Sequence, residues 1–224
     1  MDQPFPGVFR ERGRLMTKNL VPGLRSYGEE LIAAGGVEYR VWDPSRSKPA
    51  AALMNGLRNF PVRPGMKVLY LGAANGNTVS FFSDIVGSKG VVYAVEISDR
   101  AIRDLLPMAE RRGNVVPLLA NARTPRAYFW IEPVDIVYED VAARDQADIM
   151  AWNCKEFLHH GGVAAIAIKA RSIDVVAKPR DVIRTELEKL SRNFKVAEHM
   201  PLEPYEKDHE FAVMAYAPSG TALG

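Results

Sequence analysis

The sequence predicts an α/β fold in which a small antiparallel β unit precedes a seven-stranded sheet with an antiparallel last strand. From about residue 50 onward, apolar strand-like runs alternate with amphipathic helical stretches, which is the pattern of a doubly wound, mostly parallel sheet. The last two runs are joined by a segment without a helical pattern, although a parallel crossover normally contains a helix. A chain of 224 residues, 47% of them hydrophobic, can bury the core of such a fold.

Residues 1–50 are expected to form the small β unit, and residues 51–224 the larger domain. Short β-like runs occur before residue 50, at Val8–Phe9, Leu15–Thr17 and Val37–Trp42, and glycines separate them. This pattern is typical of antiparallel hairpins.

The larger domain contains seven strand candidates, several of which read as continuous apolar runs. They are Lys67–Leu71, Val91–Glu96, Val115–Ala120, Val134–Tyr138, Gly162–Ile168, Lys195–His199 and Phe211–Ala217. The clearest helical patterns lie between them, at Thr78–Val86, Ser98–Arg112, Gln146–His159 and Pro179–Ser191. Ser98 suits the N-cap of the second of these helices and Gly113 suits its C-cap.

The segment from Met200 to Glu210 decides the direction of the last strand. It has the composition of a loop, so we expect the final two strands to form a hairpin and the final strand to be antiparallel. Seven strands with an antiparallel last strand is the arrangement of class I S-adenosylmethionine methyltransferases. Ordinary dinucleotide-binding folds lack this feature.

Composition excludes several classes of function. The single cysteine, Cys154, excludes an intrachain disulfide and a cysteine-based zinc site. The four histidines show no metal-ligand spacing, so we expect no metal. The first 14 residues lack the apolar segment of a signal peptide and no run approaches the length of a membrane span, which together favour a cytoplasmic protein without membrane partners. The net charge of +2 does not by itself indicate a nucleic-acid binder.

A cofactor site is predicted where the first three strands of the larger domain end. The first strand leads into a small-residue turn from Gly72 to Thr78 that lacks the G-x-G-x-x-G pattern of diphosphate binding, so the turn suits a ligand without phosphate, such as S-adenosylmethionine. Glu96 ends the second strand, where a carboxylate can accept hydrogen bonds from both ribose hydroxyls. Asn121 follows the third strand and suits either the exocyclic amine or a ring nitrogen of adenine, or alternatively a turn.

Four polar residues are candidates for catalysis. Asp140 follows the fourth strand, Lys169 ends the fifth, His209 precedes the last strand, and Lys48 precedes the first helix of the larger domain. Strand ends of this kind meet at one edge of an open α/β sheet, where ligands bind. A ribose 2′-hydroxyl is a poor nucleophile, and it needs orientation and either a base or a cation that stabilises the developing alkoxide. A Lys–Asp pair flanked by another Lys and a His supplies these groups.

These motifs together resemble the fibrillarin family of guide-RNA-directed 2′-O-methyltransferases over nearly the whole chain. The matching segments are residues 39–48 (Y-R-V-W-D-P-S-R-S-K), 68–73 (V-L-Y-L-G-A), 92–96 (V-Y-A-V-E), 134–142 (V-D-I-V-Y-E-D-V-A), 168–174 (I-K-A-R-S-I-D) and 202–209 (L-E-P-Y-E-K-D-H). The resemblance implies that residues 51–224 are a methyltransferase domain and that the catalytic set is Lys48, Asp140, Lys169 and His209. Asn121 and Ala143 replace the aspartate and the glutamine that are usual in the family.

The resemblance also implies which residues bind S-adenosylmethionine. They are Gly72, Ala73, Gly76, Asn77, Thr78, Glu96, Ile97, Asn121, Ala122, Asp140, Val141, Ala142, Ala143 and Gln146. Local basic residues, namely Arg46, Arg171 and Lys178, are candidates for contacts with RNA phosphates.

The implied partners are a box C/D guide RNA with its target RNA, a coiled-coil Nop-type scaffold protein and a kink-turn-binding ribosomal-type protein. The chain has no Gly/Arg-rich extension and resembles the compact archaeal type, for which rRNA and tRNA are the expected substrates. Three alternatives remain: a non-catalytic subunit with weakened cofactor binding, a methyltransferase of protein side chains, and an NAD-dependent dehydrogenase. Val8–Phe9 and residues 53–60 suit either a scaffold-facing surface or the core.

Overall fold

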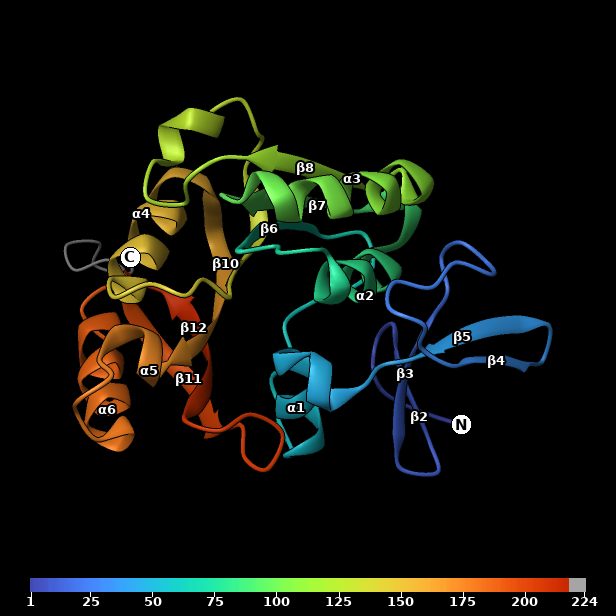
Figure 1. Ribbon diagram of the computed structural model, residues 1–224, viewed down its shortest axis with the longest axis horizontal. Coiled ribbons are helices and arrows are strands. Elements are labelled where there is room, and N and C mark those ends of the chain that lie inside the picture. Colours follow the sequence, from blue (N-terminus) through green and yellow to red (C-terminus); the bar gives the residue numbers. More distant parts are fainter. Residues whose placement is uncertain (218–224) are drawn as a thin grey trace.

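A computed structural model describes residues 1–217 and contains two sheets (Figure 1). The larger sheet has seven strands in the order β11-β12-β10-β9-β6-β7-β8. Its strands are β6 (Lys67–Leu71), β7 (Val91–Glu96), β8 (Val115–Leu119), β9 (Val134–Glu139), β10 (Leu158–Lys169), β11 (Phe194–Pro201) and β12 (His209–Tyr216). The last strand, β12, pairs antiparallel with both β10 and β11, whereas the five strands β6 to β10 pair with one another in parallel. The predicted fold class is therefore confirmed.

Some element boundaries differ from the predicted ones, and the clearest case is the junction of α4 and β10. The helix predicted to reach His159 ends at Phe157, because Leu158 already pairs with Val134 of β9. The ladder is then interrupted before Val163, and Gly161 has a φ of 82°. A glycine tolerates this left-handed conformation, so β10 starts four residues earlier than the apolar run indicated.

The smaller sheet is fully antiparallel, as predicted, and has the order β1-β2-β3-β5-β4. Its strands are β1 (Asp2–Phe5), β2 (Val8–Glu11), β3 (Arg14–Lys18), β4 (Leu31–Ala34) and β5 (Val37–Val41). The two strands that the sequence did not predict, β1 and β4, are the edge strands. Their side chains are mostly exposed or half-buried, so they lack the apolar alternation by which strands are recognised.

Six helices and three short 3-10 turns connect these strands among the described residues. They are η1 (Pro44–Arg46), α1 (Lys48–Met54), α2 (Asn77–Val86), η2 (Gly87–Lys89), α3 (Asp99–Arg112), η3 (Pro125–Tyr128), α4 (Gln146–Phe157), α5 (Ala170–Ile173) and α6 (Pro179–Leu190). Ser98 caps α3 by accepting a hydrogen bond from Ala101, and Gly113 ends it in the left-handed conformation, as predicted. None of the helices in residues 1–217 is long and apolar enough to cross a bilayer.

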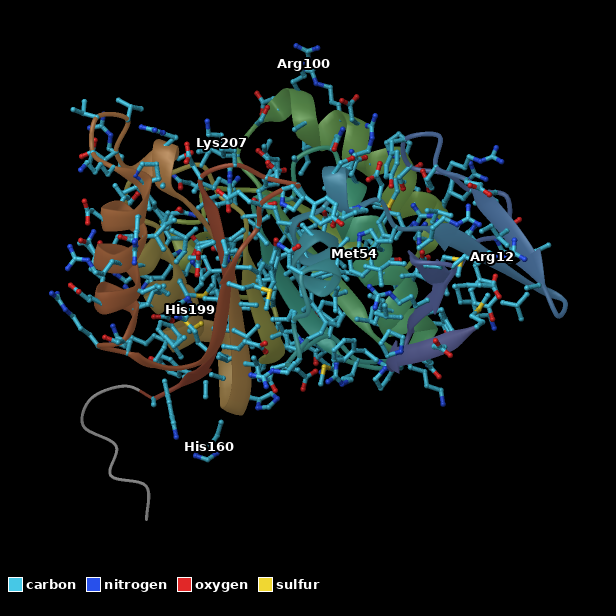
Figure 2. All side chains as sticks on the ribbon, turned by 90° about the horizontal axis from the view of Figure 1, so that it is seen from below. Arg12, Met54, Arg100, His160, His199 and Lys207 are labelled. Carbon is cyan, nitrogen blue, oxygen red and sulfur yellow. The ribbon has the colours of Figure 1, made fainter. Side chains whose placement is uncertain are left out.

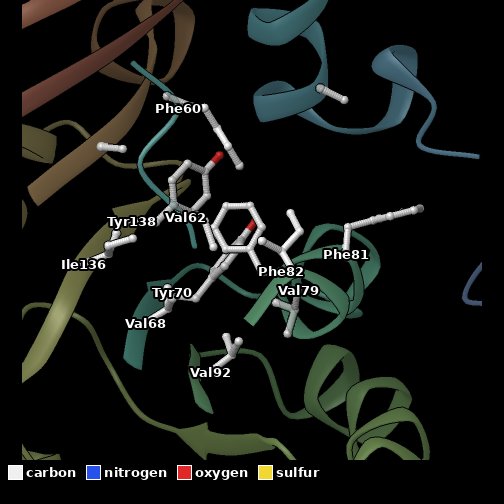
Figure 3. Packing of buried hydrophobic residues seen from close by; sticks show 14 of the residues in the cluster. Phe60, Val62, Val68, Tyr70, Val79, Phe81, Phe82, Val92, Ile136 and Tyr138 are labelled. Carbon is white, nitrogen blue, oxygen red and sulfur yellow. The ribbon is translucent and has the colours of Figure 1, made fainter. Parts of the chain in front are cut away.

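The larger sheet has a separate apolar core on each face. On one face, strand residues pack against α1, α2 and α3, and on the other they pack against α4, α6 and the turn η3. Figure 3 shows the first core, where Tyr70, Phe82 and Tyr138 form edge-on or tilted ring contacts with centroids 4.7 to 5.5 Å apart. Both faces are covered, which explains why the parallel strands read as continuous apolar runs.

The smaller sheet shares the first core with the larger domain. Trp42, which follows β5, is fully buried and stacks on Phe81 of α2 with ring centroids 5.3 Å apart. Val8 and residues 53, 57 and 60 are also buried in this core, so they do not form a scaffold-facing surface. The predicted division at residue 50 falls within α1, after the last strand of the smaller sheet.

A buried ion network also joins the smaller sheet to helices α2 and α3 of the larger domain. Arg40 of β5 contacts Glu29 at 2.5 Å and Asp84 of α2 at 2.8 Å, and Arg112 of α3 contacts the other Asp84 oxygen at 2.5 Å. Thr17 of β3 donates a further hydrogen bond to Asp84. The side chain of Arg40 is fully buried, and removing one partner from a buried network of this kind is costly.

Candidate active site

The carboxyl ends of the parallel strands surround a cavity of about 330 Å³, a volume within the range of small-molecule sites. Its lining residues come from the ends of five strands and from the segments that follow them: Gly72, Ala74, Val95, Glu96, Ile97, Ala120, Asn121, Ala122, Arg123, Asp140, Val141, Ala142, Ala143, Ile149 and Lys169. In Figure 2, Arg100 and Lys207 mark this side of the molecule, and His160, near the start of β10, lies on the opposite side.

Gly72 brings the first strand end close to Asp140. It has a φ of 83°, and a Cβ atom at this position would lie 2.9 Å from the backbone carbon and oxygen of Asp140. The backbone nitrogen of Asp140 also donates a hydrogen bond to the Leu71 carbonyl at 2.9 Å. A side chain at residue 72 would therefore push the segment that contains Asp140 away from β6.

Glu96 joins the first two walls of the cavity. One carboxylate oxygen accepts a hydrogen bond from the backbone nitrogen of Ala74 at 2.7 Å, and the other accepts from Ser98 at 2.8 Å. A carboxylate has about four acceptor positions, so two remain after these contacts. Because Glu96 lines the cavity, its remaining acceptor positions suit the pair of hydroxyls on a ribose.

Asn121 lines the third wall of the cavity with a defined amide orientation. Its side-chain oxygen accepts a hydrogen bond from the backbone nitrogen of Arg123 at 3.0 Å, and only an oxygen can accept from that donor. Asn121 therefore forms a turn through its side chain, which is one of the two predicted roles. Among the described residues, no hydrogen bond occupies its amide nitrogen. That nitrogen is a donor and suits a ring nitrogen of adenine.

Three predicted catalytic residues, Lys48, Asp140 and Lys169, form an ion cluster, and two of them, Asp140 and Lys169, line the cavity. Asp140 Oδ1 lies 2.8 Å from Lys169 Nζ and 3.1 Å from Lys48 Nζ. Lys169 Nζ also donates to the backbone oxygen of Asp140 at 2.6 Å, and Glu206 lies 4.0 Å from Lys48. Each of the three side chains is only 12% to 16% exposed. Two ammonium groups therefore hold the Asp140 carboxylate in a partly desolvated site.

His209 begins β12 directly across from Lys169 of β10. Its Nδ1 lies 2.7 Å from the backbone oxygen of Lys207. A carbonyl oxygen only accepts, so Nδ1 carries the hydrogen and Nε2 of the neutral imidazole is left as an acceptor. The structure thus brings His209 to the same sheet edge as the ion cluster, although among the described residues no hydrogen bond or ion pair joins its ring to Lys48, Asp140 or Lys169.

The fully buried tyrosines beside the cluster retain their protons. Burial raises the pKa of Tyr70 and Tyr138 well above the ordinary value, and the negative charge of Asp140 raises both pKa values further. Burial also raises the pKa of Glu139, next to Asp140, well above its ordinary value, and the charge of Glu186 adds to this effect. The neighbouring Tyr70, Tyr138 and Glu139 therefore favour their neutral forms. The positive charges of Lys48 and Lys169 compensate the negative charge of Asp140.

Five of the predicted cofactor residues lie outside the cavity lining: Ala73, Gly76, Asn77, Thr78 and Gln146. The expected cofactor contact of Gln146 does not fit the structure. Its side chain is fully buried; the amide nitrogen donates to the Val141 and Ala167 carbonyls, and the amide oxygen accepts from the Lys169 backbone. Gln146 therefore holds the backbone of the two segments that carry Asp140 and Lys169.

Thr78 makes a structural contact through its hydroxyl. Its hydroxyl donates to the hydroxyl of Ser47 at 3.0 Å, and Ser47 immediately precedes Lys48. Thr78 thus links the start of α2 to the start of α1. Gly76 ends the turn before α2 with a φ of 87°, and Asn77 begins the helix.

The three basic residues proposed for RNA contacts occupy separate positions. Arg46 lies over the ring of Tyr27 at 5.0 Å, and its side chain is 55% exposed. Arg171 pairs with Asp208 at 3.0 Å and donates to the Val175 carbonyl. Lys178 precedes the first residue of α6.

Some lining residues escaped the sequence-based prediction. Ala74, Val95, Ala120 and Ile149 line the cavity without any distinctive chemistry. Arg123 also lines it, and the signal for it was its position two residues after Asn121. In residues 1–217, no group of three His, Cys, Asp or Glu side chains has the arrangement of a metal site.

Comparison with known proteins places this site in a family. The Fibrillarin family model matches residues 2–218. A curated relative from Pyrococcus horikoshii, named fibrillarin-like rRNA/tRNA 2′-O-methyltransferase, is 50% identical over 216 residues, which cover 94% of this chain and 95% of the relative. The structure of Aeropyrum pernix fibrillarin with natively bound S-adenosyl-L-methionine matches with a TM-score of 0.84 and 44% identity, covering 90% of this chain and 88% of that one. A chain from a fibrillarin/Nop5p complex matches with a TM-score of 0.86 and 40% identity, covering 95% and 98%. The chain therefore belongs to the fibrillarin family.

Proposed function

We propose that the protein transfers the methyl group of S-adenosylmethionine to ribose 2′-hydroxyls of rRNA and tRNA, as the catalytic subunit of a box C/D ribonucleoprotein. The names of its relatives support this reaction, and the matched fibrillarin structure contains S-adenosylmethionine. The observation that carries the proposal is the ion cluster. It holds a carboxylate between two ammonium groups at a cavity whose walls suit an adenosine.

The cavity walls fit the cofactor without any phosphate-binding loop. Gly72 leaves room for close approach to the backbone, Glu96 offers acceptors for the ribose hydroxyls, and Asn121 offers an amide donor for the adenine ring. Residues 141–143 and Ile149 add apolar surface. When bound, S-adenosylmethionine supplies an electrophilic methyl group.

The residues of this chain orient and activate the ribose hydroxyl. Lys48 and Lys169 fix the Asp140 carboxylate, so that it can hold the incoming hydroxyl in one orientation. The Asp140 carboxylate accepts the proton of the hydroxyl, and as the hydroxyl oxygen acquires alkoxide character the ammonium groups of the two lysines stabilise that negative charge. The low exposure of the cluster strengthens this effect, because water screens the charges less there.

His209 is a further acceptor at this edge. With its Nδ1 hydrogen donated to the Lys207 carbonyl, its Nε2 can accept a hydrogen bond from a ribose hydroxyl. Arg46, Arg171 and Lys178 are the proposed phosphate contacts, and phosphate contacts position RNA without reading its sequence. Arg171 pairs with Asp208 at 3.0 Å, whereas Arg46 approaches Asp43 only at 4.0 Å, so Lys178 and the more weakly paired Arg46 are the stronger candidates.

In this proposal, the partners of the chain select the nucleotide that is methylated. The matched fibrillarin/Nop5p complex supports a Nop-type scaffold protein as one partner. The box C/D guide RNA and the kink-turn-binding protein complete the proposed particle. Guide pairing explains how a chain with a net charge of only +2 acts on RNA.

The proposal is tested with the chain assembled with scaffold protein, kink-turn-binding protein, guide RNA and methyl-labelled S-adenosylmethionine. Two target RNAs are compared that differ by one 2′-deoxy nucleotide at the guided position. We expect label in the first RNA and none in the second. Label that persists on the 2′-deoxy target would indicate base methylation, label in a protein would indicate side-chain methylation, and cofactor binding without any transfer would indicate a non-catalytic subunit.

A further inference from the structure

Arg123 and Asp145 form a two-pronged ion pair beside the cofactor cavity. Arg123 Nε donates to Asp145 Oδ2 at 2.7 Å, and Nη2 donates to Oδ1 at 2.6 Å. The hydrogen bonds raise the pKa of Arg123 and lower the pKa of Asp145, so both groups are charged at neutral pH. The side chains remain 44% and 29% exposed. Water can therefore replace this contact when it opens.

The pair connects two walls of the cavity that the sheet does not connect. Arg123 lies in the lining segment after β8, and Asp145 follows the lining segment after β9. In the sheet, β6 and β7 separate these two strands, so no strand ladder joins their ends. The side chain of Asp145 makes no capping hydrogen bond to α4, and among the described residues Arg123 is the side chain with which it pairs.

A second contact joins the segment after β8 to helix α4. Asn153 of α4 is fully buried; its amide nitrogen donates to the Ala122 carbonyl at 2.8 Å, and its oxygen accepts from the Tyr128 hydroxyl at 2.6 Å. Breaking this buried anchor would leave polar groups without partners, which is costly. An exposed ion pair adds little to folding stability. The segment after β8 is therefore held by the buried hydrogen bond from Asn153. It is also held by the exposed Arg123–Asp145 ion pair, which can break at little cost.

Arg123 is also joined to Asn121 through its backbone. The backbone nitrogen of Arg123 donates to the Asn121 side-chain oxygen at 3.0 Å, so displacement of Arg123 also displaces the residue proposed to face adenine. We infer that the Arg123–Asp145 pair is a clasp at the rim of the cofactor cavity, which holds Asn121 in place when closed and slows cofactor release. Both are positioning residues. The inference rests on the proposed function, because it takes S-adenosylmethionine as the occupant.

The clasp is tested by the rate at which labelled S-adenosylmethionine leaves the full chain after a chase with unlabelled cofactor. The variants are Arg123→Gln, Asp145→Asn, the double variant, and the exchanged pair Arg123→Asp with Asp145→Arg. We expect each single variant to speed release by about three- to tenfold, as for one partly exposed charged contact. The double variant should release no faster than a single one, and the exchanged pair should restore most of the native rate.

Arg14→Gln is the matched control, because Arg14 forms an exposed pair with Glu30 at 2.8 Å in the smaller sheet. Release from this variant should equal the native rate, and all variants should keep the native melting temperature. Unchanged release in the single variants, or additive effects in the double variant, overturns the clasp while the proposed function stands. A native chain that binds no S-adenosylmethionine at all overturns the proposed function itself.

Discussion

Replacing Glu139 by glutamine should remove a defined part of the pH dependence of stability. Glu139 ends β9 and is fully buried, and neither carboxyl oxygen has a hydrogen-bond partner among the described residues. Burial raises its pKa well above 4.5, the charges of Glu186, Asp145 and Asp140 raise it further, and Lys169 opposes them. The folded protein therefore keeps a proton that the unfolded chain releases.

The sign of the effect follows from this difference in proton binding. Above the pKa that Glu139 has in the unfolded chain, release of the proton lowers the free energy of the unfolded state. The free energy of unfolding therefore falls as the pH rises. The fall is about 1.4 kcal/mol per pH unit, or roughly 2.5 to 3 kcal/mol over two units, until the pH reaches the folded pKa. Glutamine has nearly the same shape and does not ionise, so the Glu139→Gln variant should lack this decline.

Urea unfolding of the native chain and the variant at pH 5, 6, 7 and 8 measures the effect. The difference in the free energy of unfolding between the two should change in favour of the variant as the pH rises. Glu188→Gln is the control, since Glu188 is exposed on α6, and it should follow the native chain. Parallel curves for the native chain and the Glu139→Gln variant would refute the reasoning, because they would mean that Glu139 ionises in the folded protein.

Three other substitutions test the scaffold and the cavity. Arg40→Met should lower the free energy of unfolding by about 3 to 5 kcal/mol in urea titrations, because it leaves Asp84 in a broken buried network; a loss below 1 kcal/mol would contradict this. Gly72→Ala should weaken S-adenosylmethionine binding at least about tenfold by calorimetry, since the new Cβ would displace Asp140, and native affinity would count against the close approach. Asn121→Asp should bind the cofactor about three- to tenfold more weakly, because a carboxylate has no hydrogen to donate to a ring nitrogen of adenine, and tighter binding would favour a contact with the exocyclic amine instead.

The alternation of apolar strands and amphipathic helices was sufficient to predict the larger sheet. The loop between the last two strands gave the direction of β12, because sequence separation alone limits a parallel crossover. The edge strands β1 and β4 and the short helices α1 and α5 were not predicted. They are short or lack an apolar alternation, and their form depends on contacts made after folding.

The candidate site was predictable where a charged residue stands at the end of an apolar strand. Glu96, Asp140 and Lys169 lie at the ends of apolar runs and meet at the cavity. The roles of Gln146 and Thr78 could not be read in the same way, because their partners, Ala167 and Ser47 among them, are distant in the sequence. Contacts of this kind depend on the packing of helices against the sheet.

The most direct test of the central claim is the rate of a single methyl transfer in the assembled particle at saturating S-adenosylmethionine, with the native chain and with Asp140→Asn. Saturation separates transfer from cofactor binding. The ion cluster of Lys48, Asp140 and Lys169 predicts a rate at least about a hundredfold lower for the variant, the range typical of a lost acid–base or electrostatic contact. Transfer by Asp140→Asn at close to the native rate would contradict the account, because it would show that the carboxylate between the two lysines does not act on the ribose hydroxyl.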